Sequence, residues 1–126
     1  MSADMYKKLN KIINKEFLVA GAAKLTEESV KLIYENLPKY SEIVDPNSPL
    51  QQYDDKIHKM YHILKNHFSD QEDEVSFAVV RACAFVLGYL VQDVDIVPDY
   101  ISEVGELDDA ILVKVMLDLY SEEFSL

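Results

Sequence analysis

Four aspartates near the C-terminal end are the first residues whose type could support chemistry: Asp95, Asp99, Asp108 and Asp109. Carboxylate oxygens are the ligands that hard divalent cations such as Mg²⁺ and Ca²⁺ take in proteins. The spacing is not that of an EF-hand loop, and Asp108 and Asp109 open an apolar segment, where carboxylates cap free backbone N–H groups. The pattern therefore favours a structural role, and a divalent-cation site, with or without hydrolytic activity, is the alternative.

A second group is Asp54, His58 and His62, which follow one another at four-residue intervals. On one helix face these side chains could bind Zn²⁺ or Ni²⁺. No Glu follows His58, as a zinc protease motif would require, so we expect a solvated polar face. The sequence contains no Ser-His-Asp order, glycine-rich phosphate loop or Cys-His pair that would indicate nucleophilic or phosphoryl chemistry. We therefore expect a protein that is not an enzyme and has no resident cofactor.

The charge is strongly acidic and unevenly distributed. The 126 residues carry a net charge of −11, and residues 91–126 hold ten acids against the single base Lys114. A negative field of this kind repels phosphate backbones, so nucleic acid is excluded as an expected partner. A basic protein surface, or cations, are the partners that the charge favours.

The N-terminal segment is basic on one side. Its lysines are Lys7, Lys8, Lys11 and Lys15. Such a face suits a membrane surface or an acidic partner, and it equally suits an ordinary solvated helix, which we favour. Cys83, the only cysteine, lies in an apolar run and is predicted to be a buried, inert thiol. With no apparent secretory signal, these features favour the cytoplasm.

Hydrophobic spacing predicts five helices and no strands. Thr26 is a predicted N-cap, Ser69 and Glu72 form a predicted capping box, and Gly21 is expected to break the first helix. The predicted helices run from about Ala3 to Leu18, from Thr26 to near Pro38, from after Pro49 to about Phe68, from Ser69 to about Val91, and from Leu107 or Asp108 to about Tyr120.

The segment Val75–Val91 is apolar nearly all round, with Arg81 near its middle. It is shorter than the ~20 residues that cross a bilayer, so we expect the central helix of a bundle. An unpaired charge among apolar side chains is costly. We therefore predict that Arg81 pairs with Asp95, Asp108 or Asp109.

The connector between the last two helices, residues 92–110, resembles the YkvA-like family of domains of unknown function. The matching residues are Asp95, Pro98, Asp99, Tyr100, Ile101, Gly105, Leu107, Asp108 and Asp109. The resemblance covers roughly residues 80–117 and implies two helices joined by a structured acidic loop, with no known reaction or cofactor. Asp93-Val94 stand where the family usually has Ser-Pro, and Ser102-Glu103 stand where it tends to have a Pro.

The connector residues also have their own physical reading. Pro98 fixes the path of the chain, and Gly105 offers a position that can take positive φ. The sequence as a whole predicts an all-α, single-domain bundle of about five helices over residues 1–126, with a structured acidic connector before the last helix. We expect a non-enzymatic protein-interaction module, and the sequence leaves its oligomeric state open.

Overall fold

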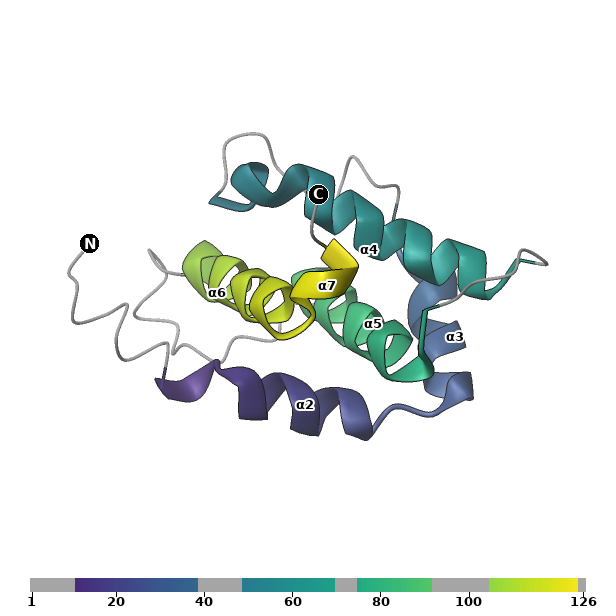
Figure 1. Ribbon diagram of the computed structural model, residues 1–126. Coiled ribbons are helices and arrows are strands. Elements are labelled where there is room, and N and C mark those ends of the chain that lie inside the picture. Colours follow the sequence, from purple (N-terminus) through teal and green to yellow (C-terminus); the bar gives the residue numbers. More distant parts are fainter. Residues whose placement is uncertain (1–10, 39–48, 70–74, 92–104, 125–126) are drawn as a thin grey trace.

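The computed structural model describes residues 11–38, 49–69, 75–91 and 105–124 (Figure 1). These residues form α-helices and one 3₁₀-helix and contain no strand, so the predicted all-α class is confirmed. The elements are α2 (Lys15–Ala23), α3 (Glu27–Glu35), the 3₁₀-helix η2 (Pro49–Tyr53), α4 (Asp54–His67), α5 (Phe77–Val91), α6 (Gly105–Leu119) and α7 (Ser121–Phe124).

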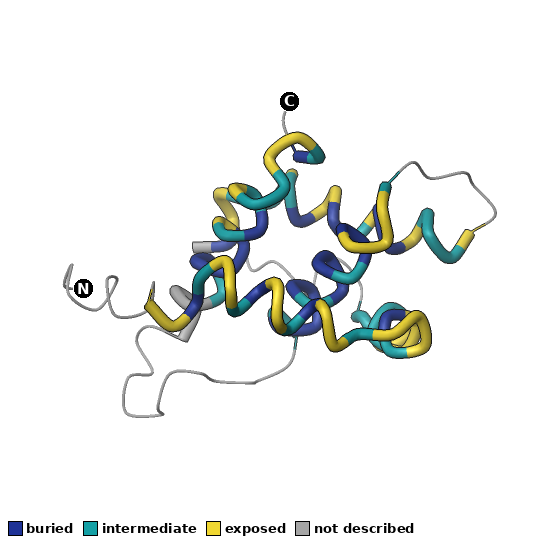
Figure 2. The backbone as a smooth tube through the Cα atoms, turned by 60° about the horizontal axis from the view of Figure 1, so that its bottom comes forward, coloured by how far each residue is buried: buried dark blue, intermediate teal, exposed yellow. Residues whose placement is uncertain are grey.

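Helix α5 is the centre of the bundle. Figure 1 shows it between α2 and α4, and α3 and α6 also pack against it. Nine of its 15 residues are buried, including Val80, Cys83 and Leu87, and the buried sides of the surrounding helices turn inward (Figure 2). Among the described residues, no helix combines the length and apolar character needed to cross a membrane. The predicted central helix is therefore confirmed.

The predicted break at Gly21 is wrong. Helix α2 continues through Gly21 to Ala23, and it begins at Lys15, where the Oδ1 atom of Asn14 accepts a hydrogen bond of 3.0 Å from the N–H of Phe17. The predicted helix from Ala3 lies outside the described residues up to residue 10. Gly21 packs against the ring of Phe85 on α5. An isolated glycine is tolerated inside a helix and does not by itself end it.

Two helix starts had been predicted from caps, and one is confirmed. The Thr26 hydroxyl accepts a 3.1 Å hydrogen bond from the N–H of Ser29 and opens α3. The capping box at Ser69 is wrong: its hydroxyl donates to the Asn66 carbonyl at 3.1 Å and closes α4. Helix α5 begins at Phe77, after Ser76, whose backbone and side-chain oxygens face the N–H of Val79. Glu72 lies outside the described residues.

The C-terminal end differs from the prediction in two ways. Helix α6 begins at Gly105, two or three residues earlier than the expected start at Leu107 or Asp108. After it comes the unpredicted α7, which buries Phe124 to 2% exposure. Lys56 and Lys59 of α4 donate hydrogen bonds to the carbonyls of Phe124 and Glu123. The Lys59 ammonium also lies 5.6 Å from the centroid of the Phe124 ring, so the C-terminal turn is fixed to α4.

Candidate functional site

A hollow of about 500 Å³ lies between α3 and α5 near the C-terminal end of each helix. We call it the α3–α5 groove. Its lining consists of Leu32, Ile33, Asn36, Pro38, Gly88 and Val91. Five of these residues are apolar and one carries an amide, so the groove is a site for apolar groups rather than for charged ones.

Helix α3 forms the outer wall of the groove. Its buried residue, Val30, faces the core, and Ile33 packs partly against the same core. Leu32 lies off this inner face and is 55% exposed, the highest value among the large hydrophobic residues that the structure describes. The wall ends at Asn36, whose side-chain amide donates a 2.7 Å hydrogen bond to the Leu32 carbonyl. This bond fixes the helix end that carries Leu32.

Helix α5 supplies the floor of the groove at Gly88. A Cβ atom built on Gly88 would lie 3.5 Å from Cγ2 of Ile33, which is an ordinary van der Waals contact. The missing side chain therefore leaves space beside Ile33 that a methyl group would fill without strain. Val91, the last residue of α5, is half-buried and lines the groove at that end.

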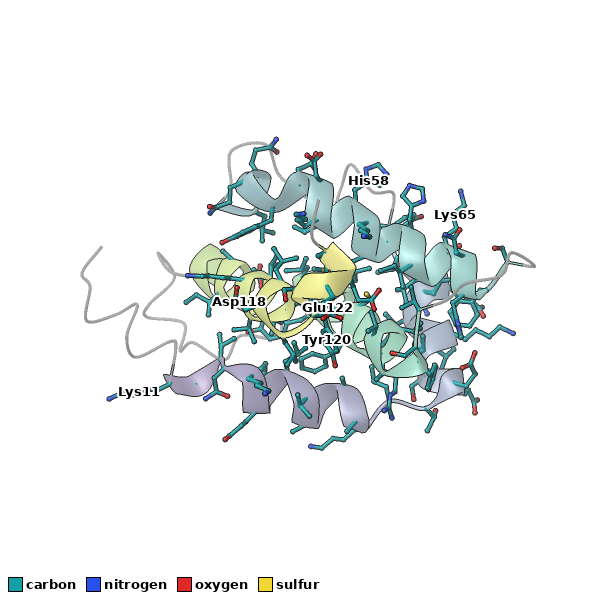
Figure 3. The ribbon with its side chains drawn as sticks, in the orientation of Figure 1. Lys11, His58, Lys65, Asp118, Tyr120 and Glu122 are labelled. Atoms are coloured by element: carbon teal, nitrogen blue, oxygen red, sulfur yellow. The ribbon has the colours of Figure 1, made fainter. Side chains whose placement is uncertain are left out.

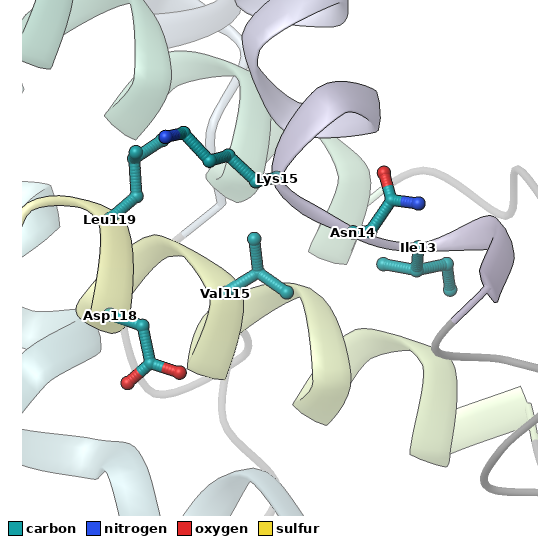
Figure 4. A pocket seen from close by; sticks show the side chains of 6 residues that line it. All are labelled: Ile13, Asn14, Lys15, Val115, Asp118 and Leu119. Atoms are coloured by element: carbon teal, nitrogen blue, oxygen red, sulfur yellow. The ribbon is translucent and has the colours of Figure 1, made fainter.

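A second cavity, of about 390 Å³, lies between the start of α2 and the second half of α6 (Figure 4). Lys15 reaches over it towards Leu119, whereas the Asp118 carboxylate points away from Lys15, so the two charges do not face each other. The Asn14 amide at its edge is engaged in capping α2 and in a bond to the Lys11 carbonyl. This cavity therefore offers one ammonium group and no converging polar set.

The predicted acidic site falls largely outside the described residues. The undescribed part of the chain includes Asp95, Pro98 and Asp99, and the side chain of Asp108 is not described either. Asp108 and Asp109 are the fourth and fifth residues of α6, so they follow the helix start instead of opening it. In the described part of the chain no three His, Cys, Asp or Glu side chains are placed to hold a metal ion. The cation site at the four aspartates stays a prediction.

Gly105 does not take the positive φ that the sequence allowed. It is the first residue of α6, and no described glycine has a positive φ. Because its backbone is helical, the glycine here serves no left-handed turn.

The predicted pairing of Arg81 with Asp95 or Asp108 stays a prediction, because those side chains lie outside the described residues. The ion pair found among the described residues joins His67 and Glu27 and does not involve Arg81. The guanidinium carbon of Arg81 lies 5.3 Å from the centroid of the Phe77 ring, one turn towards the start of α5. Its Nε atom is buried and has no hydrogen-bond partner among the described residues. The side chain thus points away from Val91, the end of α5 that leads into the aspartate motif, because helical side chains lean towards the N-terminus.

The ring of Phe77 also contacts His67, which the sequence reading did not single out. The two ring centroids are 5.7 Å apart, and the His67 Nε2 atom lies 2.8 Å from Oε1 of Glu27. The His67–Glu27 contact joins the end of α4 to the start of α3. Glu27 is 62% exposed, so the pair contributes little to stability.

His58 and His62 lie together on the outside of α4. Their rings are stacked, with centroids 4.7 Å apart and an interplanar angle of 4°. Both residues are exposed, and Figure 3 shows His58 pointing away from the bundle. The predicted polar face of this helix is therefore present, with the two imidazoles on it.

Sequence reasoning missed the two residues that define the groove, Leu32 and Gly88. Leu32 could have been noticed because it is a large apolar residue that does not belong to the inner stripe of its helix. Gly88 could have been noticed as a small residue within an apolar helix, where glycine often marks a close approach. Neither signal indicates that the two residues lie at one groove.

Residues 79–115 match the model of a family described as a protein of unknown function (DUF1232). The match covers α5 from Val79 and α6 as far as Val115, so it includes Gly88 and Val91 of the groove. No curated protein and no solved structure matches the chain. The family is uncharacterised, so its description assigns no activity.

Proposed function

We propose that this chain is a non-enzymatic helical module that binds another protein through the α3–α5 groove. The observation that supports the proposal is the pairing of the exposed Leu32 with the hollow of about 500 Å³ beside it. Large exposed apolar residues next to a preformed hollow are typical of surfaces that receive a partner. The matched segment, which we infer to be the YkvA-like hairpin from its nine motif residues, supplies the floor of this groove.

The lining of the groove favours binding over catalysis. The described lining residues include no acid, base or nucleophile, and the one polar side chain among them, that of Asn36, bonds to the backbone of its own helix. Small-molecule sites usually add several converging polar groups to an apolar wall. A groove with aliphatic walls from two helices instead fits the apolar side chains of an amphipathic helix.

The charge of the chain supports a basic partner. The groove ends at Val91, at the C-terminus of α5, where the helix dipole places partial negative charge. The sequence from residue 91 onward is also strongly acidic, and the whole chain carries a charge of −11. A partner helix with leucines on one face and lysines or arginines beside them satisfies both the groove and the field.

The proposal can be tested with two model peptides of equal length, one a leucine-lysine amphipathic helix and the other its leucine-glutamate counterpart. Methyl NMR of the isotope-labelled protein reports binding at Leu32, Ile33 and Val91. We expect the lysine peptide to shift these methyl signals and the glutamate peptide to leave them unchanged. Equal shifts with both peptides, or shifts confined to other surfaces, would contradict the proposal.

Two variants locate the binding to the groove. Gly88→Ala fills the floor with a methyl group at ordinary contact distance, and Leu32→Glu removes the exposed wall residue. Both are expected to fold and to weaken the binding of the lysine peptide at least tenfold. Ile12→Glu is the matched control, because Ile12 is 49% exposed and the change adds the same charge away from the groove. Wild-type affinity in Gly88→Ala and Leu32→Glu would contradict the proposal.

A further inference from the structure

The solvent side of α2 is a second unpartnered surface, and it is independent of the α3–α5 groove. Five exposed residues, Glu16, Val19, Ala20, Ala23 and Lys24, form what we call the α2 outer face. Lys15 is also exposed, but it reaches towards Leu119 of α6 (Figure 4) and is not part of this face. The opposite side of the helix, with Leu18 and Ala22, is buried. Figure 1 shows α2 along the lower edge of the molecule, with α5 and α6 above it and no described element below.

The α2 outer face is apolar and small at its middle and charged at its two ends. Val19 is 45% exposed although it is a large apolar residue. Ala20 and Ala23 have side chains small enough to allow another helix to approach to about 8 Å between axes. The charged residues are Glu16, four residues before Ala20, and Lys24, four residues after it.

This arrangement is complementary to itself. At 1.5 Å per residue, Glu16 and Lys24 each lie about 6 Å along the helix axis from Ala20, in opposite directions. A two-fold axis through Ala20 and perpendicular to the helix would bring Glu16 of one chain beside Lys24 of the other, and would do so twice. We propose that a second copy of this chain docks antiparallel on the α2 outer face.

Other occupants fit this surface less well. Glu16 lies on the same face as Ala20 and Ala23, so an anionic membrane would meet a carboxylate at one end of the contact, on a chain of net charge −11. A different protein would need its own matching acid and base. The contact between two helices of nine residues is below the size of a standard interface, so the association is weak and depends on concentration.

Disulfide trapping tests the geometry directly. Ala20→Cys places a thiol at the proposed two-fold axis, and the native Cys83 is fully buried and does not compete. Ala78→Cys is the matched control, because Ala78 is an exposed alanine on α5. Under mild oxidation we expect Ala20→Cys to form covalent dimers at least tenfold faster than Ala78→Cys. Equal rates in the two variants would overturn the proposal.

Charge exchange identifies the Glu16–Lys24 contact. In the Ala20→Cys background, Glu16→Lys or Lys24→Glu alone places like charges together and should slow cross-linking at least threefold. The double variant Glu16→Lys/Lys24→Glu restores opposite charges and should restore the rate. All of these positions are exposed, so thermal unfolding is expected to show folded proteins.

A second measurement distinguishes a second copy of the chain from a membrane as the binding partner of the α2 outer face. Sedimentation of the wild-type chain should show a reversible monomer–dimer equilibrium that Glu16→Lys shifts towards monomer. The pairing would be contradicted if the double variant Glu16→Lys/Lys24→Glu stays monomeric while each of the two single variants dimerises. A monomer at every concentration, or binding to vesicles of phosphatidylcholine and phosphatidylglycerol without any dimer, would overturn the proposal.

Discussion

Gly21 of α2 lies against the aromatic ring of Phe85 on α5, so that a Cβ atom at residue 21 would come within 2.9 Å of the Phe85 Cδ1 atom. The same ring packs edge-on against Phe17, with centroids 5.6 Å apart. A glycine in a helix interior costs about 1 kcal/mol relative to alanine. The contact with Phe85 explains why α2 carries this cost.

We predict that Gly21→Ala lowers the free energy of unfolding by about 1–2 kcal/mol, because overpacking against Phe85 outweighs the better helix propensity. Phe85→Leu, which removes ring atoms near residue 21, should relieve most of this loss in the double variant. A double-mutant cycle in urea measures the coupling between the two positions. Additive effects of the two changes would show that the ring does not limit residue 21.

The cap of α2 is a second prediction. Asn14→Ala removes the acceptor of the Phe17 N–H and should lower the free energy of unfolding by about 1 kcal/mol. Asn14→Asp keeps an acceptor oxygen at the same place and adds a favourable charge at the helix N-terminus, so it should be close to wild type. Chemical denaturation of the three proteins compares these values, and equal losses in both variants would contradict the cap.

Breaking up a buried ion pair usually lowers the free energy of unfolding, and for Arg81 we predict no such loss. Arg81→Met removes a buried Nε atom that has no hydrogen-bond partner in the described part of the chain, and it keeps most of the packed volume, so it should leave stability unchanged or raise it. Arg81→Ala also loses the packing of the stem and should cost about 1–2 kcal/mol. A loss of roughly 3–5 kcal/mol in Arg81→Met would instead indicate that a buried carboxylate had been stranded.

The contact between α4 and α7 predicts a specific role for Lys59. Lys59→Met removes the hydrogen bond to the Glu123 carbonyl and the cation–π contact with Phe124, at an expected cost of about 1–2 kcal/mol. Lys31→Met, at an exposed lysine of α3, is the control and should change stability by less than about 0.5 kcal/mol. Thermal unfolding that does not distinguish the two variants would contradict this role.

Metal content tests the alternative reading of the acidic motif. Protein purified without chelator should contain less than stoichiometric divalent metal by mass spectrometry, and added Zn²⁺ or Mg²⁺ should not raise its melting temperature. If Mg²⁺ or Ca²⁺ does stabilise the protein, Asp95→Asn together with Asp99→Asn should abolish the shift. Loss of a zinc-dependent shift in a variant with His58 and His62 replaced by Ala would place a site on α4 instead.

The sequence by itself determined the helical class, the apolar central helix and the start of α3. These features depend on the local sequence: the Thr26 hydroxyl reaches Ser29, three residues away, and α5 is apolar nearly all round apart from Arg81. The α3–α5 groove was not predicted. Leu32 could have been noticed as an apolar residue off the inner stripe, but nothing local places it beside Gly88.

Tertiary packing decided the rest. Gly21 was expected to break the first helix, but α2 continues through it to Ala23. The packing of α5 on α2 brings the ring of Phe85 against this glycine. The guanidinium of Arg81 lies over the ring of Phe77, because helical side chains lean towards the N-terminus. The bond from Lys56 to Phe124 joins residues 68 positions apart. Such contacts follow from how whole helices pack together, which no local pattern of residues specifies.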